Sequence, residues 1–285
     1  MTSFDNADFV VYSAEGSPFS VSRVKLQDGS LVFRDMFSCC DASNDDSSQV
    51  LELSEKEAEL AILLRLLHTP PDPPVEFIRL PRTEKVKTHL PIRYDLSTAI
   101  PLPIIRLMRA LADKYAIEAS ILKHLEPHLV AHAPEHALEV YSTAVSLGMP
   151  LVVNEASQYI LPLSWYSQDE IKLIPTAISY HNIHRLQTFR VKALQDILLR
   201  EPLFPHGYGT CPNHDDAAAI WERTALILSR KIESNSDVGG EMESLYYIYQ
   251  SCSACSKALR AALDMLAYKC RRVPRRLDQL PNEDV

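Results

Sequence analysis

The sequence predicts an α+β fold, with a small mixed sheet and its helices in the first part of the chain and an all-α helical domain after it. Two apolar segments near the start, residues 9–12 and 18–26, have the alternation or clustering typical of strands. From Ile104 onward, apolar residues recur every three or four positions, as on one face of a helix. A chain of 285 residues is long enough for two domains. We therefore expect one domain at residues 5–130 and a second at residues 131–285.

A β-hairpin is expected to open the sheet. Its strands are the two apolar segments, and residues 15–16, Glu-Gly, supply the turn between them. After residue 29 the apolar spacing becomes helical, with Phe33, Met36 and Phe37 within one turn of each other. A polar stretch rich in Asp and Ser then separates this helix from the next apolar run.

A leucine-rich helix is predicted from about residue 55 to residue 68, after a short strand at residues 50–53. Ser54 and Glu57 have the spacing of a capping box, in which each side chain accepts a hydrogen bond from the other's backbone amide. Four leucines then share one face of the helix: Leu60, Leu63, Leu64 and Leu67. The prolines of residues 69–74 end it, because proline lacks an amide donor and clashes with the preceding turn.

Apart from one more short strand at residues 75–80 and an irregular insertion at 81–101, the rest of the chain is expected to be helical. Ser167 and Glu170 again have the spacing of a capping box. The expected helical segments are 104–115, 121–129, 134–148, 151–161, a helix with the apolar stripe Leu186, Phe189, Ala193 and Ile197, the helix around Trp221, and 241–271.

Composition argues against several classes of function. The formal net charge of −8 disfavours general binding to nucleic acid, which depends on neutralising phosphates with Lys and Arg. The basic segment 269–277 is the local exception, and we interpret it as a solvated tail. The chain has only 7 glycines and lacks the glycine-rich phosphate loops, HExxH and GxSxG. We therefore expect no enzyme.

The start of the sequence has neither a basic region nor the apolar run of a signal peptide. No stretch of about 18 apolar residues predicts a membrane-spanning helix. Six cysteines without a secretory signal favour reduced thiols over a disulfide framework. A cytoplasmic or nuclear location, with no membrane partner, is the resulting expectation.

Two pairs of residues carry the strongest chemical signal in the chain. Cys211-Pro-Asn-His214 and Cys252-Ser-Ala-Cys255 both have the two-residue separation common in structural zinc sites. Four ligands would close the site, so the zinc would staple the fold and would not catalyse a reaction. Two alternatives remain: the thiols are buried as small apolar groups, with His214 capping a helix, or the ion has an open position and the protein is an enzyme.

Several motifs stand in the order of a known family. They are Asp8-Phe9-Val10-Val11, Phe19-x-x-Ser22-Arg23-x-x-Leu26, Ser30-x-x-Phe33-x-x-Met36-Phe37, the strand at 50–53, the leucine-rich helix, and ALADKYAI at 110–117. Together they resemble the BTB/POZ domain, and the insertion near 70–100 is similar to that of the divergent BTB proteins numerous in fungi. The segment LVAHAPEHALEVYSTAVSLGM resembles the helical extension that often follows this domain. The family usually has His in place of Ser22 and an aromatic residue near His68.

The resemblance implies a protein-interaction module that dimerises or docks other proteins without catalysis. It places Phe33, Met36 and Phe37 on a helix whose inner side anchors the core, while exposed neighbours such as Arg34 border a binding surface. Two alternatives are a substrate adaptor for a cullin-type ubiquitin ligase and a BTB-type transcriptional regulator. Residues 38–41, Ser-Cys-Cys-Asp, lack the acidic position typical of cullin-binding members, so a cullin partner has less support.

Overall fold

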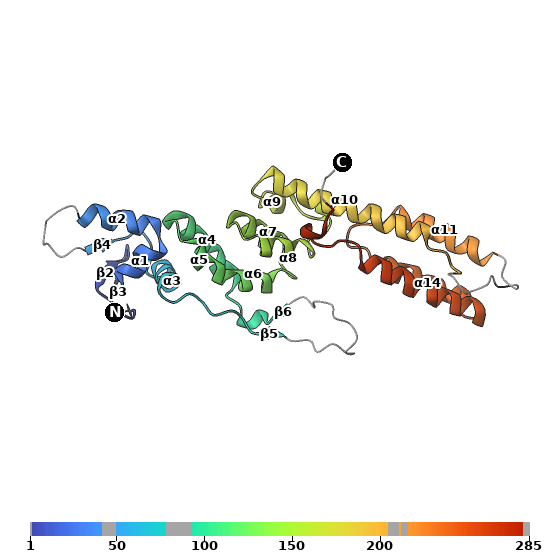
Figure 1. Cartoon of the computed structure of the whole chain (residues 1–285), viewed down its shortest axis with the longest axis horizontal. Helices are drawn as coiled ribbons and strands as arrows, with labels where there is room; N and C mark the ends of the chain where they lie inside the picture. The colour runs from blue at the N-terminus through green and yellow to red at the C-terminus, as the bar shows by residue number, and fades with distance from the viewer. Residues whose placement is uncertain (1, 42–49, 78–92, 205–210, 212–215, 282–285) are drawn as a thin grey trace. The chain divides into compact units, whose positions relative to one another are not determined.

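The computed structural model describes residues 2–41, 50–77, 93–204, 211 and 216–281 (Figure 1). The chain divides into two compact units, Met1–Ala156 and Ser157–Val285. We expected the first domain to end at residue 130, but the first unit extends to Ala156. Helix α6 (Glu126–His132) packs against α4 and α7 within that unit. Within the described residues, no helix is both long and apolar enough to cross a membrane.

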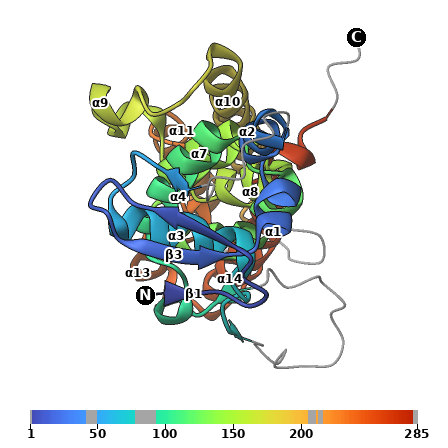
Figure 2. The same ribbon diagram turned by 90° about the vertical axis from the view of Figure 1, so that its left-hand side faces the viewer.

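A four-stranded mixed sheet lies in the first unit, in the order β1 (Thr2–Ser3), β3 (Pro18–Val21), β2 (Phe9–Tyr12), β4 (Val50–Glu52). The predicted hairpin is confirmed, since β2 and β3 pair in antiparallel register and Gly16 takes a positive φ of 79° in the turn between them. Strands β1 and β4 add on either side in parallel, β1 to β3 and β4 to β2. Figure 2 shows α3 behind this sheet. The α+β class predicted from the sequence is therefore observed.

The second predicted strand of the hairpin ends early, so its extension to residue 26 was wrong. Residues Arg23–Gly29 form the helix α1. The carboxylate of Asp8 accepts a hydrogen bond from the backbone amide of Arg23, at 2.7 Å, and so satisfies one free donor at the helix start. A short apolar alternation is compatible with either element, and this tertiary contact favours the helix.

The leucine face of α3 (Glu57–His68) is confirmed, because Leu60, Leu63, Leu64 and Leu67 are all buried. The capping box expected at Ser54 was wrong. The helix begins two residues later than that box requires, and the backbone amide of Lys56 donates to the carboxylate of Glu59 at 3.2 Å. Glu57 instead bonds the hairpin turn, where its carboxylate accepts from the Ser17 hydroxyl at 2.8 Å.

The other elements of the first unit are mostly helical. Its remaining helices are α2 (Leu31–Asp41), α4 (Leu102–Tyr115), α5 (Ala119–Leu122), α7 (Ala137–Ser146) and α8 (Pro150–Ser157, which ends in the second unit). The strand expected at 75–80 is represented by β5 (Glu76–Phe77), which pairs with β6 (Arg93–Tyr94). Residues 78–92, which contain most of the expected insertion, lie outside the described part of the chain.

The regular secondary structure in the described residues of the second unit is all helical. Its long helices are α10 (Ala177–Arg200), α11 (Ala217–Ser229) and α14 (Ser253–Arg271), and α10 packs against both of the others (Figure 1). Shorter helices are α9 (Gln168–Ile171), α12 (Val238–Met242) and α13 (Tyr246–Tyr249). Single 3₁₀ turns occur in the two units at Leu96–Thr98, Lys123–Leu125, Leu163–Trp165, Glu243–Leu245 and Leu277–Gln279. The core contains Trp221 and apolar residues of all three long helices.

Two local predictions for the second unit have different outcomes. The capping box at Ser167 and Glu170 is confirmed, with hydrogen bonds of 2.8 Å and 3.3 Å in the two directions. The stripe predicted on α10 is only partly right, because Phe189, Ala193 and Ile197 are half-buried. The fully buried face continues from Leu186 at four-residue steps, through Arg190, Leu194 and Leu198. The buried arginine is the reason that apolar spacing alone did not find this face.

Candidate metal centre

Three of the four predicted zinc ligands lie together in the second unit. The sulfur atoms of Cys211, Cys252 and Cys255 are all within 4.8 Å of one another, and those of Cys211 and Cys252 are 3.6 Å apart. The fourth predicted ligand, His214, lies outside the described residues. The spacing of the two sequence pairs therefore predicted the meeting of segments that are about 40 residues apart.

The start of α14 positions two of these thiols. Cys252 is the residue just before the helix, and its backbone amide donates to the carbonyl of Tyr249 at 3.1 Å. Cys255 lies in the first turn and is fully buried. Cys211 belongs to the same apolar core as Trp221 and is also buried. The three side chains thus converge at the edge of the core, where one thiol remains partly accessible.

The surroundings of Cys252 and Cys255 shift the pKa values of these two thiols in opposite directions. Hydrogen bonds from the backbone amide of Cys255, from Ala254 and from the Cys211 thiol lower the pKa of Cys252 to about 6. Burial, together with its hydrogen bonds to Cys211 and Cys252, raises the pKa of Cys255 to about 12. At neutral pH the Cys252 thiolate therefore lies beside the protonated thiol of Cys255. A bound divalent ion would deprotonate Cys255 as well, because metal ions bind thiolates.

The geometry of the cluster fits a thiolate-binding metal ion. Tetrahedral zinc with Zn–S bonds of about 2.3 Å requires sulfur atoms about 3.8 Å apart. The separation of 3.6 Å between the sulfur atoms of Cys211 and Cys252 lies close to that value, and the other two separations are no longer than 4.8 Å. None of the three cysteines is in a disulfide, and 3.6 Å is too long for an S–S bond. Three thiols in this arrangement can bind a metal ion, and the described residues contain no other group of three His, Cys, Asp or Glu ligands so placed.

The residues named for the interaction surface lie in the first unit. Phe33 and Phe37 are buried, and Met36 is half-buried. Arg34 is exposed, and its guanidinium pairs with the carboxylate of Glu118 at 3.2 Å. The two phenylalanines therefore serve the core, and only their neighbours can contact a partner directly.

Sequence reasoning missed one group in the second unit that has unusual chemistry. Arg190 is buried on α10, and no motif marks it, because its partners come from segments far away in the chain. The only signal available in the sequence was its four-residue spacing with Leu186, Leu194 and Leu198.

Comparison of the chain with protein-family models gives no match, and comparison with curated proteins gives none either. The likeness to BTB/POZ domains therefore rests on the motifs quoted above and stays a prediction. The metal site rests on the geometry of the three cysteines.

Proposed function

We propose that the protein is a protein-interaction module that acts without catalysis. Its first unit would be a BTB/POZ-like domain that dimerises or docks other proteins, and its second unit a helical domain stapled by zinc. The observation that carries this proposal is that the separate motifs of the resemblance meet in one core in the first unit. Phe33, from the helix after the hairpin, stacks on Tyr115 of the ALADKYAI segment, with ring centroids 5.1 Å apart.

Further contacts join the same motifs. The ring of Phe9 in β2 meets Phe37 edge-on at 5.2 Å. The buried hydroxyl of Ser30 donates to the carbonyl of Tyr115 at 2.5 Å and accepts from the amide of Phe33 at 3.2 Å. Residues from separate motifs of the resemblance therefore contact one another. This is expected if the motifs belong to one domain and not to unrelated segments.

The helices α1 and α2 also present apolar side chains to solvent. Val24 on α1 is 58% exposed and Leu31 at the start of α2 is 47% exposed, although their neighbours Leu26 and Phe33 are fully buried. Because α1 and α2 pack against each other, we treat the exposed sides of these two helices as one candidate surface. Exposed apolar groups gain free energy when another protein covers them. We therefore place the dimer contact on this surface.

Sedimentation equilibrium of the full chain over a wide concentration range tests the dimer. We expect reversible dimerisation, weakened in the double variant Val24→Asp, Leu31→Asp without a change in melting temperature. Leu151→Asp is the matched control, because Leu151 is 68% exposed but lies on α8, in the described part of the first unit. A chain that is monomeric at every concentration would remove the dimer, and the absence of any protein retained in pull-down would remove docking as well.

We infer that the cysteine cluster holds one structural zinc ion, with His214 as the fourth ligand. The thiol set supports zinc, because Cys and His are the usual ligands of closed structural sites. Burial of Cys211 and Cys255 supports a structural role over a catalytic one, since catalysis needs an open coordination position. Elemental analysis should find one zinc per chain, retained during dialysis against a chelator and lost on unfolding. A readily exchangeable ion would instead favour an enzyme.

A further inference from the structure

Arg190 is held in the core of the second unit by backbone carbonyl groups. Its side chain is 7% exposed, and its Nε donates to the carbonyl of Ser234 at 2.8 Å. Its Nη1 donates to the carbonyls of Pro274 and Val273 at 2.8 and 3.3 Å. Nη2 forms no hydrogen bond with any residue that the structure describes. One edge of the guanidinium group is therefore fixed, and the other has donors still to satisfy.

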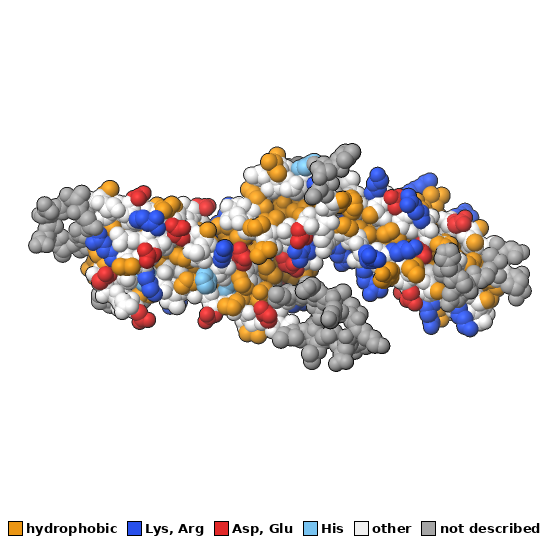
Figure 3. Space-filling model, viewed as in Figure 1, with side chains coloured by type: hydrophobic (Ala, Val, Ile, Leu, Met, Phe, Trp, Pro, Cys, Tyr) orange, Lys and Arg blue, Asp and Glu red, His pale blue; other side chains and the backbone are white. Residues whose placement is uncertain are grey.

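The positive charge of Arg190 is not neutralised within the described residues. Unlike the many exposed Lys and Arg side chains of this unit (Figure 3), it is buried, yet it forms no ion pair. Burial and the nearby charge of Arg275 lower the pKa of Arg190 to about 10. Two carboxylates of the surrounding region have other partners, since Glu201 pairs with Lys269 and Asp237 accepts from the amide of Gly240 at 3.2 Å. Burying an unpaired cation normally costs several kcal/mol.

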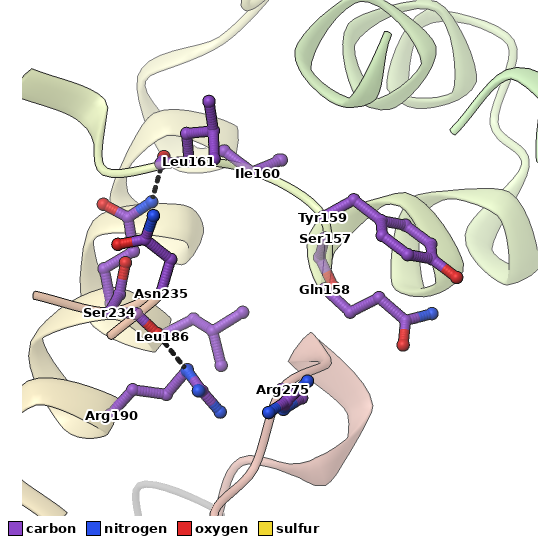
Figure 4. Close-up of a pocket in the computed structure, with 11 residues that line it drawn as sticks. Ser157, Gln158, Tyr159, Ile160, Leu161, Leu186, Arg190, Ser234, Asn235 and Arg275 are labelled. Carbon is purple, nitrogen blue, oxygen red and sulfur yellow. Dashed lines mark hydrogen bonds between the residues drawn. The ribbon is translucent and has the colours of Figure 1, made fainter. Parts of the chain in front are cut away.

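A cavity of about 120 Å³ adjoins these two arginines. Figure 4 shows Arg190 on its helix and Arg275 on the C-terminal segment beside the same space, with Ser234 nearby. Ser234 is 6% exposed, and its hydroxyl oxygen has no hydrogen-bond partner among the described residues. Asn235 and Arg275 are exposed at the rim. A water molecule occupies about 30 Å³ in the liquid, so the cavity has room for a few waters or for one small oxyanion.

We propose that this cavity binds a phosphate-type oxyanion between the guanidinium groups of Arg190 and Arg275, with the hydroxyl of Ser234 as a further donor. Planar guanidinium groups match the oxygen spacing of such anions and form charge-assisted hydrogen bonds with them. The anion satisfies both the free Nη2 donors of Arg190 and the unpartnered hydroxyl. It also offsets the mutual repulsion of the two cations.

A bound anion would stabilise the second unit against unfolding. Arg190 belongs to α10, Ser234 to the segment between α11 and α12, and Arg275 to the segment after α14. The anion therefore connects three parts of the chain that unfolding would separate. A ligand that binds only the folded state raises the melting temperature with its concentration.

The simpler interpretation is that Arg190 only clamps the carbonyls of residues 234, 273 and 274. That interpretation gives Arg275 no role and predicts no specific response to anions. It differs from the proposal in one measurable way, because Arg275 forms no side-chain hydrogen bond or ion pair within the described residues and its substitution should leave the clamp intact.

The test uses the full chain, titrated with inorganic phosphate or sulfate while sodium chloride keeps the ionic strength constant. We expect a saturable rise in melting temperature with both oxyanions and none with chloride alone. In Arg275→Gln the apparent dissociation constant for phosphate should rise roughly tenfold or more, since one charge-assisted contact is lost. Arg271→Gln, which removes an exposed charge at the end of α14, should bind phosphate as the native chain does.

A second variant separates the anion site from folding. Ser234→Ala removes the unpartnered hydroxyl and should weaken phosphate binding, measured by isothermal titration calorimetry, without lowering stability in phosphate-free buffer. An unsaturable response, or the same affinity in the native chain and in Arg275→Gln, would overturn the proposal.

Discussion

The backbone amide of Ser22 donates a hydrogen bond to Nε2 of the buried His68, at 2.9 Å. The other ring nitrogen, Nδ1, lies 2.9 Å from the carbonyl of Leu64, so the ring is neutral with its proton on Nδ1. This single side chain joins the end of β3 to the last turn of α3. The sequence departs from the BTB pattern at Ser22 and near His68, and in this protein the two residues are partners.

Stability should fall as the pH is lowered through the histidine range. Burial lowers the pKa of His68 below its ordinary value of 6.5, and the nearby charge of Lys25 lowers it further. The unfolded chain then binds more protons than the folded one below about pH 6.5, so the free energy of unfolding decreases with falling pH there and is regained above it. Urea denaturation at several pH values measures this slope.

His68→Gln provides the comparison for that experiment. The variant cannot take up the proton, so its slope between neutral and mildly acidic pH should be smaller than that of the native chain. Some slope should remain, because burial also lowers the pKa of His128. Identical slopes in both proteins would show that His68 does not titrate in this way.

A second buried polar contact stabilises the first unit. The carboxylate of Glu55, 4% exposed, accepts hydrogen bonds from the Tyr115 hydroxyl and from Lys114. Burial alone would raise the pKa of Glu55, but hydrogen bonds from Lys114 and Tyr115 outweigh it, and the pKa is lowered. Glu55→Ala leaves the buried hydroxyl without this acceptor, so we expect a loss of about 2–4 kcal/mol in the free energy of unfolding.

Chemical denaturation followed by circular dichroism measures that loss. Glu52→Ala is the control, because Glu52 is an exposed carboxylate in β4, close by in sequence. Tyr115→Phe should cost less, about 1–2 kcal/mol, because Lys114 still pairs with the carboxylate. A Glu55→Ala variant as stable as the control would contradict the assigned role.

Close approach of three elements explains why residue 29 is glycine. A Cβ atom added to Gly29 would lie 2.6 Å from Cδ2 of Leu67 and 2.8 Å from Cδ1 of Ile121. Gly29→Ala therefore forces both side chains to move, and we expect a loss of about 1–3 kcal/mol in stability. Asp28→Ala changes an exposed residue of the same helix and should cost less. Equal melting temperatures for the two variants would mean that the core adjusts freely.

Periodic patterns predicted most of the fold, and they failed where a tertiary contact or a polar group decided the structure. The leucine face of α3 was predictable because its four leucines recur at the three- and four-residue intervals of a helix and all are buried. Helix α1 was missed because its start depends on Asp8, which no local pattern marks. The predicted face of α10 was misplaced because the buried face includes Arg190. The burial of Arg190 depends on carbonyls from residues 234, 273 and 274.

The two candidate sites also differ in whether a local sequence pattern predicts them. Paired ligands at fixed spacing are a local signal, and they predicted that Cys211 would meet Cys252 and Cys255. The cavity beside Arg190 and Arg275 has no such signal, because single residues on three segments form it. Only the folded chain shows that two cations line one cavity, and that its described lining residues include no carboxylate.

Cys252 offers the sharpest separation of zinc binding from simple burial of thiols. Cys255 is fully buried, so replacing it costs stability in either case. Cys252 is only half-buried and has a pKa of about 6, so its substitution removes a metal-binding thiolate but little apolar contact. With zinc bound, Cys252→Ala should lose the metal and lower the melting temperature of the chain. Without zinc, the variant should melt close to the native protein.

Elemental analysis, together with melting curves recorded with and without a chelator, distinguishes zinc binding from simple burial of the thiols. Cys39→Ser is the control, since Cys39 is an exposed free thiol in the first unit and should leave the metal content unchanged. Removal of the metal from the native chain should expose the Cys252 thiolate, which would react with iodoacetamide near neutral pH faster than Cys39 does. A native chain that contains no zinc, melts identically in chelator, and tolerates Cys252→Ala would establish burial alone as the reason for the cluster.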